Sequence, residues 1–85
     1  MDCLFCRIAA GEIPSRKVYE DDQMLAFHDI APVAPTHILL IPKAHIGGAD
    51  ELTAENADVV AHIFAMIPKI AAEAGISAYR VVTNN

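Results

Sequence analysis

The sequence predicts an α+β domain in which one long helix covers one face of an antiparallel sheet. Three observations lead to this fold class. Short β-prone runs occupy the first half of the chain, a long run with helical spacing of apolar residues follows, and a last β-prone run covers residues 79–83. Strands, one helix and a further strand in this order are typical of α+β domains. The 85 residues allow a single domain, residues 1–85, with a thin core.

The N-terminal part of the chain is expected to form a short helix and then a β-hairpin. Residues 3–10 are mostly apolar and end at Gly11, which predicts one or two turns of helix. Two β-prone runs, residues 18–20 and 24–28, flank the aspartates at positions 21–22. Aspartate side chains accept hydrogen bonds from nearby backbone N–H groups and favour turns. This segment is therefore predicted to be a hairpin.

A loop and a buried strand are expected next. Pro32 and Pro35 indicate a loop over residues 31–36. Residues 37–41 form a continuous, largely apolar run that ends at Pro42. Such runs are typical of strands buried on both faces, so this strand is predicted to lie at the centre of the sheet.

The longest predicted element is a helix from about Thr53 to Ala74. Its apolar residues recur at spacings of three and four, which places them on one face. They are Val60, Ile63, Phe64, Ile67, Ile70, Ala71 and Ala74. Thr53 is a suitable N-cap, and Gly75 is a natural end for the helix. Pro68 removes one backbone hydrogen bond and is expected to kink the helix unless packing compensates.

Composition and charge exclude several classes of function. The chain has 11 acidic and 6 basic residues, giving a net charge of −5, and its basic residues are scattered. A nucleic-acid partner is therefore not expected, because binding a phosphate backbone needs a basic surface. No apolar run approaches the length of a membrane span, and the N-terminus lacks the layout of a signal peptide. Two cysteines without such a signal indicate reduced thiols and a cytoplasmic location.

Cys3 and Cys6 have the two-residue spacing that lets both sulfurs face one tetrahedral metal. His45 could supply a third ligand to a zinc ion. Two alternatives remain on spacing alone: a redox pair, which the intervening Leu-Phe fits poorly, and two buried structural thiols.

Histidines and one aspartate are the other candidates for a functional site. His62 lies on the polar face of the predicted helix, where it is expected to be solvated and to have no role. His28 ends one predicted strand and His37 begins another, so both could lie at the same edge of the sheet, or be half-buried histidines bonded to backbone. Asp29 could accept both hydroxyls of a ribose while Ile30 packs on a base, or could simply cap the following turn.

Six short blocks occur along the chain in a particular order. They are Cys-Leu-Phe-Cys-Arg-Ile at 3–8, Gly-Glu-Ile-Pro at 11–14, Tyr-Glu-Asp-Asp at 19–22, Ala-Phe-His-Asp-Ile at 26–30, Ala-Pro-Thr-His at 34–37 and Ile-Pro-Lys-Ala-His-Ile at 41–46. Together with Tyr-Arg-Val-Val-Thr-Asn at 79–84 they strongly resemble the histidine-triad (HIT) superfamily, and its Hint-like branch above all. The resemblance covers essentially the whole chain.

This resemblance implies a HIT-like antiparallel sheet with one long helix, and a homodimer. It implies binding of purine nucleotides such as AMP, and hydrolysis or transfer of the nucleotidyl group of AMP-phosphoramidate-like substrates without an organic cofactor. The residues implied to line the base and sugar pocket are Phe5, Ile8, Phe27, His28 and Ile30. Asp29 would hold the ribose hydroxyls, and His37 and Asn84 would stand near the phosphate. In zinc-binding members, Cys3, Cys6 and His45 match three ligands of a structural zinc ion.

One feature of the family is missing from the chain. The His-x-His-x-His segment that gives the family its name, and that contains the nucleophilic histidine, is expected beyond Asn85. The fold is therefore expected to be incomplete at its C-terminal end, and the 85 residues alone are predicted to be inactive. The alternative function is that of a catalytically inactive fragment that binds nucleotide or dimerises.

Overall fold

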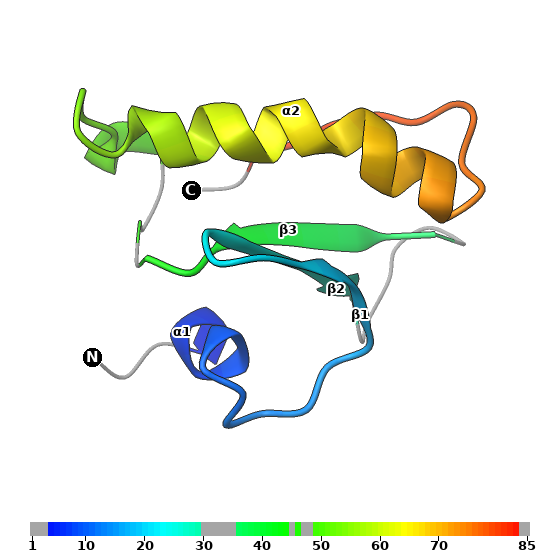
Figure 1. Cartoon of the computed structure of the whole chain (residues 1–85), viewed down its shortest axis with the longest axis horizontal. Coiled ribbons are helices and arrows are strands. Elements are labelled where there is room, and N and C mark those ends of the chain that lie inside the picture. Colours follow the sequence, from blue (N-terminus) through cyan, green and yellow to red (C-terminus); the bar gives the residue numbers. More distant parts are fainter. Residues whose placement is uncertain (1–3, 30–35, 45, 47–48, 84–85) are drawn as a thin grey trace.

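The computed structural model of the chain describes residues 4–29, 36–44, 46 and 49–83. These residues form three strands and two α-helices, with one short 3₁₀ turn before the second helix (Figure 1). In chain order they are α1 (Leu4–Ala9), β1 (Lys17–Glu20), β2 (Met24–His28), β3 (Ile38–Pro42), η1 (Ala49–Glu51) and α2 (Ala57–Glu73). The predicted α+β class, with an antiparallel sheet and one long helix, is confirmed. In the part of the chain that the structure describes, no helix is long and apolar enough to span a membrane.

The sheet has the order β1-β2-β3, and both pairs of strands are antiparallel. The prediction that residues 37–41 form the central strand is wrong, because β2 lies between its two neighbours. Four of the five β2 residues, 24–27, are buried, whereas every residue of β3 is only half-buried. Both segments are apolar enough to be central, and the pairing of β2 with β1 through the hairpin decides which of them is.

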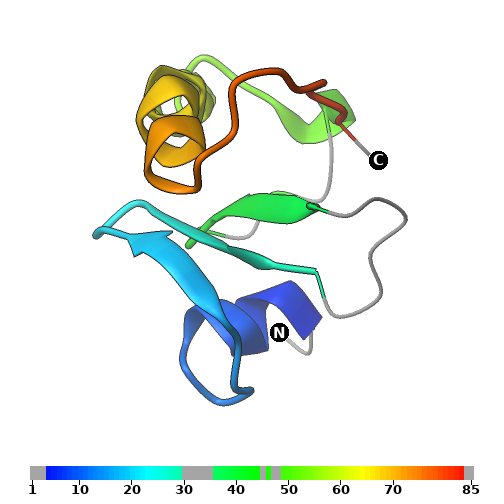
Figure 2. The ribbon, with the colours of Figure 1, turned by 90° about the vertical axis from the view of Figure 1, so that its right-hand side faces the viewer.

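Both faces of the sheet are covered, so the prediction of one covered face is also wrong. Side chains alternate between the two faces of a strand. Leu25 and Phe27 therefore pack with Ile8 of α1 on one side, while Met24 and Ala26 pack with Ile70 of α2 on the other. Figure 2 shows the sheet between the two helices. The short helix α1 was predicted, but its packing was not: it buries Ile8 against the second face of the sheet.

The turn between β1 and β2 is the predicted aspartate turn. Oδ1 of Asp21 accepts hydrogen bonds from the backbone N–H groups of Gln23, at 2.8 Å, and Met24, at 2.9 Å. The backbone N–H of Asp21 donates in turn to the carbonyl of Met24, at 3.0 Å. These bonds close the hairpin within the turn itself, as an Asx turn does.

Helix α2 begins at Ala57, four residues after the predicted N-cap. Thr53 nevertheless acts as a cap for the turn that leads into the helix. Its Oγ1 accepts from the backbone N–H of Asn56 at 3.3 Å, and Oδ1 of Asn56 accepts from the backbone N–H of Thr53 at 2.8 Å. This reciprocal pair is a capping box in which asparagine takes the place of the usual glutamate.

The other end of α2 matches the sequence prediction closely. The helix is assigned without interruption through Pro68, whose side chain is exposed, to Glu73. Gly75 adopts a φ of 74°, the left-handed conformation that ends many helices. The backbone N–H of Gly75 donates to Ala72, and that of Ile76 donates to Ala71, which is the Schellman pattern.

The predicted final strand, residues 79–83, does not form. Among the residues that the structure describes they have no ladder partner; they are exposed and lie on the α2 side of the sheet in both views (Figure 1, Figure 2). Tyr79, Val81 and Val82 have the β-branched or aromatic side chains of a strand, which is why the sequence predicted one. Their side chains remain largely in solvent, so burial does not hold the segment against the sheet.

Candidate functional site

The ladder between β2 and β3 brings Asp29 and His37 together where the two strands end. The backbone N–H of Asp29 donates to the carbonyl of His37 at 2.9 Å. On the side chains, Oδ2 of Asp29 lies 3.1 Å from Nδ1 of His37, and both are half-buried. His28 stands next to them, opposite Ile38 in the ladder. The expectation that His28 and His37 could share one edge of the sheet therefore agrees with the register.

The His37 ring lies beside the Asp29 carboxylate without an aligned hydrogen bond at Nδ1. Its Nδ1 is buried from solvent and makes no hydrogen bond of good geometry, although the Asp29 carboxylate is within contact distance. A buried ring nitrogen of this kind has capacity for a better-aligned partner. The pair thus offers carboxylate oxygens that accept hydroxyl protons beside an imidazole.

The apolar residues predicted to contact a base differ in how deeply their side chains are buried. Ile8 and Phe27 belong to the core between α1 and the sheet, and Phe27 is only 4% exposed. Phe5, on α1, is 45% exposed. Of these three side chains, only that of Phe5 is open to solvent. Two other predicted site residues, Ile30 and Asn84, lie outside the described residues.

The predicted metal site is only partly described. Cys6 is half-buried on α1, while Cys3 and His45 lie outside the described residues. Within the described ranges, no three potential ligands gather at one place. The donor set itself suits zinc, because two thiolates and an imidazole are ligands that this ion prefers. A structural zinc ion held by Cys3, Cys6 and His45 stays a prediction.

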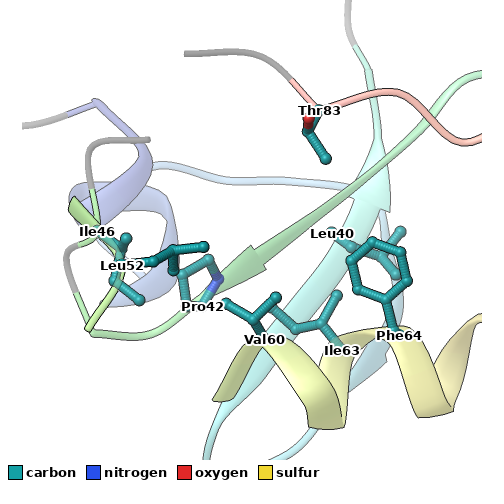
Figure 3. A pocket seen from close by; sticks show the side chains of 8 residues that line it. All are labelled: Leu40, Pro42, Ile46, Leu52, Val60, Ile63, Phe64 and Thr83. Carbon is teal, nitrogen blue, oxygen red and sulfur yellow. The ribbon is translucent and has the colours of Figure 1, made fainter. Parts of the chain in front are cut away.

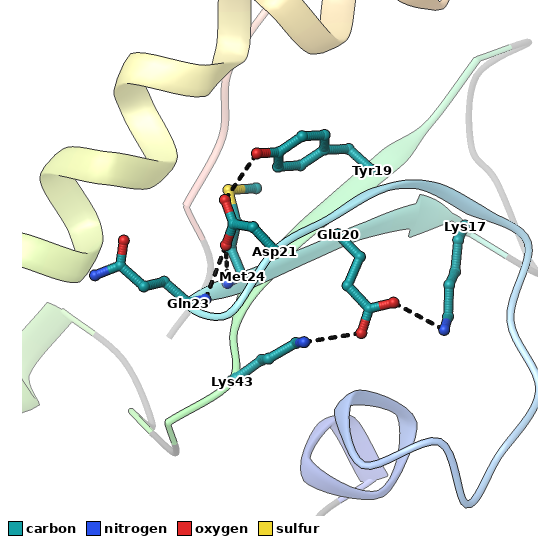
Figure 4. A network of polar contacts seen from close by, with 7 residues as sticks. All are labelled: Lys17, Tyr19, Glu20, Asp21, Gln23, Met24 and Lys43. Carbon is teal, nitrogen blue, oxygen red and sulfur yellow. Dashed lines mark hydrogen bonds and ion pairs between the residues drawn. The ribbon is translucent and has the colours of Figure 1, made fainter.

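His62 was expected to be solvated, and this part of the expectation is wrong; that it has no functional role stays a prediction. Its Nε2 lies 2.6 Å from Oδ2 of Asp21 in the β1–β2 turn, and both side chains are half-buried. The hydroxyl of Tyr19 donates to the same oxygen at 2.8 Å (Figure 4). The two partners are 41 positions apart, so only the packing of α2 on the sheet brings them together. No local sequence signal distinguishes His62 from the other polar residues of its helix.

A second charged group lies on the outer side of the hairpin. Glu20 accepts from Lys17 at 2.9 Å and from Lys43 at 2.8 Å (Figure 4). These two hydrogen bonds, from Lys43 and then Lys17, lower the pKa of Glu20 below its ordinary value. Lys17 is exposed and Lys43 is half-buried, so these ion pairs join β1 to the residue after β3 but are expected to add little to stability.

An apolar hollow of ≈ 200 Å³ lies between β3 and α2. Figure 3 shows the side chains around it. The lining residues are Leu40, Pro42, Ile46, Leu52, Val60, Ile63, Phe64 and Thr83. Thr83 supplies the single hydroxyl of this set, and no charged side chain is present. The hollow therefore lacks the groups that a phosphorylated ligand needs.

Comparisons with known proteins agree with the motif order. The family described as "Scavenger mRNA decapping enzyme C-term binding" matches residues 2–85. Protein HitA of Neisseria gonorrhoeae is 42% identical over 76 residues, which are 89% of this chain and 71% of the relative. Among solved structures, a histidine triad protein from Clostridium difficile is 52% identical with a TM-score of 0.93, covering 99% of this chain and 75% of that chain. A HIT family hydrolase from Legionella pneumophila is 46% identical with a TM-score of 0.89, covering 95% and 74%.

The family match covers nearly the whole chain, and the relatives and the similar solved structures agree with it. The chain therefore belongs to the histidine-triad (HIT) family.

Proposed function

We propose that the chain is part of a HIT-family hydrolase or nucleotidyl transferase that binds purine nucleotides and acts on AMP-phosphoramidate-like substrates. Family membership supports the hydrolase class, since relatives such as the Legionella pneumophila protein are named as hydrolases. The observation that carries the nucleotide part is the Asp29–His37 pair, which places an acceptor carboxylate beside an imidazole at one edge of the sheet.

The pair and its neighbours have the chemistry that a nucleoside monophosphate requires. In this proposal Asp29 accepts the two ribose hydroxyls, and bonds of this kind to a charged acceptor are stronger than neutral ones. Phe5 stacks on the base, while Ile8, Phe27 and Ile30 give an apolar wall and His28 stands beside the sugar. His37 and Asn84 approach the phosphate. The exposure of Phe5 supports its assignment to stacking on the base, and the burial of Ile8 and Phe27 supports their assignment to the apolar wall.

The chemical step in this proposal needs a nucleophile that these residues do not supply. A histidine expected beyond Asn85 attacks the α-phosphorus, and the P–N bond to the leaving amine breaks. The resulting nucleotidyl-histidine is then opened by water, which releases AMP. None of His28, His37, His45 and His62 is assigned this role. The 85 residues alone are therefore proposed to bind nucleotide without turnover, as an inactive binding fragment would.

The first test is titration of the chain with AMP by calorimetry. The Asp29→Asn variant keeps the shape of the side chain but loses its charge. We expect its AMP affinity to fall roughly tenfold or more, since a hydrogen bond to a charged group contributes about 1.5–3 kcal/mol. Asp22→Asn, an exposed aspartate in the turn at the other end of β2, is the matched control and should bind as the unaltered chain does.

Two outcomes would contradict the binding assignment: no AMP binding by the unaltered chain at millimolar concentration, or equal affinity in the Asp29→Asn variant. The reaction has a separate test. A longer form of the protein that carries the His-x-His-x-His segment should release AMP from adenosine phosphoramidate, and failure to do so would remove the reaction assignment while leaving the binding site intact.

We also propose that the protein forms a homodimer and holds a structural zinc ion. Phe64 of α2 is 49% exposed and lies beside the apolar hollow, and Leu52 and Val82 are exposed as well, which supports a protein partner. Light scattering after size-exclusion chromatography should give twice the mass of the chain.

Metal analysis of the purified chain should find zinc, and Cys6→Ser should remove it. A metal-free chain would contradict the zinc site.

A further inference from the structure

The contact between Asp21 and His62 lies at the opposite end of β2 from the Asp29–His37 pair. It joins the β1–β2 turn to α2 through a 2.6 Å separation between Oδ2 and Nε2. Around it the helix and sheet meet through apolar side chains, with Ile70 and Met66 of α2 against Met24 and Ala26 of β2. The Asp21–His62 contact therefore adds a polar link to a helix–sheet contact that is mainly apolar.

The Asp21 carboxylate is fully occupied by donors. Oδ1 accepts from the backbone N–H groups of Gln23 and Met24, and Oδ2 accepts from Tyr19 and contacts His62. An ionised carboxylate can only accept hydrogen bonds. The proton of the His62 ring must therefore lie on Nε2 for the short contact to be favourable.

Other titratable and charged groups surround the contact. Tyr19 of β1 has Asp22, Glu73 and Lys69 near it, and Asp58 lies four residues before His62 on α2, on the same side of the helix. The Nζ of Lys69 lies 5.2 Å from the centre of the Tyr19 ring, a cation–π distance. β3 faces this side with Ile38 and Leu40, which do not titrate.

These surroundings keep Asp21 charged. Burial acts to raise the pKa of Asp21, but the hydrogen bonds from His62, the Gln23 N–H, Tyr19 and the Met24 N–H outweigh it, and the pKa falls well below its ordinary value. The hydrogen bond to Asp21 raises the pKa of Tyr19, so Tyr19 remains a donor. The Asp21 carboxylate is thus an anion both at neutral pH and in mild acid.

We propose that Asp21 and His62 form a proton-sensitive latch between α2 and the β1–β2 hairpin. With a neutral His62 ring the latch is a hydrogen bond from Nε2–H to the carboxylate. A second proton, on Nδ1, turns the same contact into an ion pair, so that mild acid tightens the attachment of α2. Stronger acid neutralises Asp21 and releases the latch. The proposed latch does not depend on nucleotide binding.

The test uses hydrogen exchange of α2 backbone amides in the full chain at pH ~8 and pH ~5.5, on either side of the range in which histidine ordinarily changes charge. His62→Gln is the informative variant, because its amide N–H can replace the Nε2–H donor but cannot take a proton. His62→Leu removes the donor as well. Rates are corrected for the intrinsic pH dependence of exchange.

In the unaltered chain, we expect corrected protection of α2 to rise roughly fivefold from pH ~8 to pH ~5.5, because a positive charge on the ring adds ion-pair attraction to a hydrogen bond whose acceptor is already an anion. His62→Gln should match the unaltered chain at pH ~8 but show no rise, and His62→Leu should be less protected at both. Asp22→Asn, in the same turn, should keep the rise. An equal rise in His62→Gln, or no rise in the unaltered chain, would overturn the latch.

Discussion

Two aspartates at opposite ends of β2 have different surroundings. Asp21 accepts two hydrogen bonds from its own turn and contacts two side chains, so its carboxylate is part of the structure of the hairpin. Asp29 follows β2 and lies beside a buried ring nitrogen of His37 that has no aligned hydrogen bond. At the level of single residues, the first carboxylate is suited to holding the fold and the second to receiving a ligand.

Gly75 gives a prediction about one backbone conformation. Its φ of 74° is left-handed, where a Cβ costs roughly 1 kcal/mol, and an added Cβ would meet no neighbouring atom. Gly75→Ala should therefore lower the free energy of unfolding by about 1 kcal/mol through backbone strain alone. Gly75→Asn should cost less, because asparagine tolerates this region better. Urea denaturation of both variants checks the order, and an Ala variant as stable as the unaltered chain would contradict it.

The start of α2 depends on the reciprocal bonds between Thr53 and Asn56. Thr53→Ala removes the hydroxyl that accepts from the Asn56 and Glu55 N–H groups. We expect a loss of roughly 1 kcal/mol in unfolding free energy, the usual effect of removing a capping side chain. Thr53→Ser keeps the hydroxyl and should retain most of the stability. If the serine variant lost as much as the alanine variant, the methyl group rather than the cap would be responsible.

Strand β2 is the element on which both core clusters depend. Leu25 is 0% exposed and packs toward α1, so Leu25→Ala should cost roughly 2–5 kcal/mol in unfolding free energy through lost burial and a residual cavity. Leu4→Ala makes the same chemical change at a side chain that is 58% exposed. It should alter stability much less, and similar losses in the two variants, measured by urea denaturation, would show that β2 is not the centre of the core.

Features set by neighbouring residues could be predicted from the sequence, and features set by distant ones could not. The Asp21 turn and the end of α2 at Gly75 follow from local hydrogen bonding and backbone conformation. The central position of β2 depends on which strands pair, and two apolar runs were equally suited to it. Residues 79–83 have strand-forming side chains, but a strand also needs a partner. His62 was missed for the same reason, since its partner lies 41 positions away.

The same distinction between neighbouring and distant residues applies to the candidate site. The proximity of Asp29 and His37 could be anticipated because each adjoins the end of a predicted strand, and antiparallel register places such ends together. The depth of Ile8 and Phe27 in the core, against the exposure of Phe5, depends on how α1 packs and was not visible in the sequence.

At the scale of the whole molecule, the fold has three layers, and α1 and α2 cover opposite faces of the sheet (Figure 1). The Asp29–His37 pair of the proposed nucleotide site lies at one end of β2, and the Asp21–His62 contact of the proposed latch lies at the other. Changes at the latch should therefore reach the site only through β2 and the packing of α2. Stability and nucleotide binding can be measured independently.

The acid dependence of the stability of the whole chain gives the last prediction. The pKa of Asp21 in the folded chain lies below its ordinary value of 3.8, so the folded state binds this proton less readily than the unfolded state does. Its contribution to stability is then complete above that value and is lost as the pH falls through the lower, folded pKa. Asp21→Asn should be less stable than the unaltered chain at pH ~7 and should approach it in strong acid. Urea denaturation between pH ~7 and pH ~2 measures both curves, with Asp22→Asn as the control in the same turn. Parallel curves for Asp21→Asn and the unaltered chain would mean that another carboxylate carries the acid sensitivity.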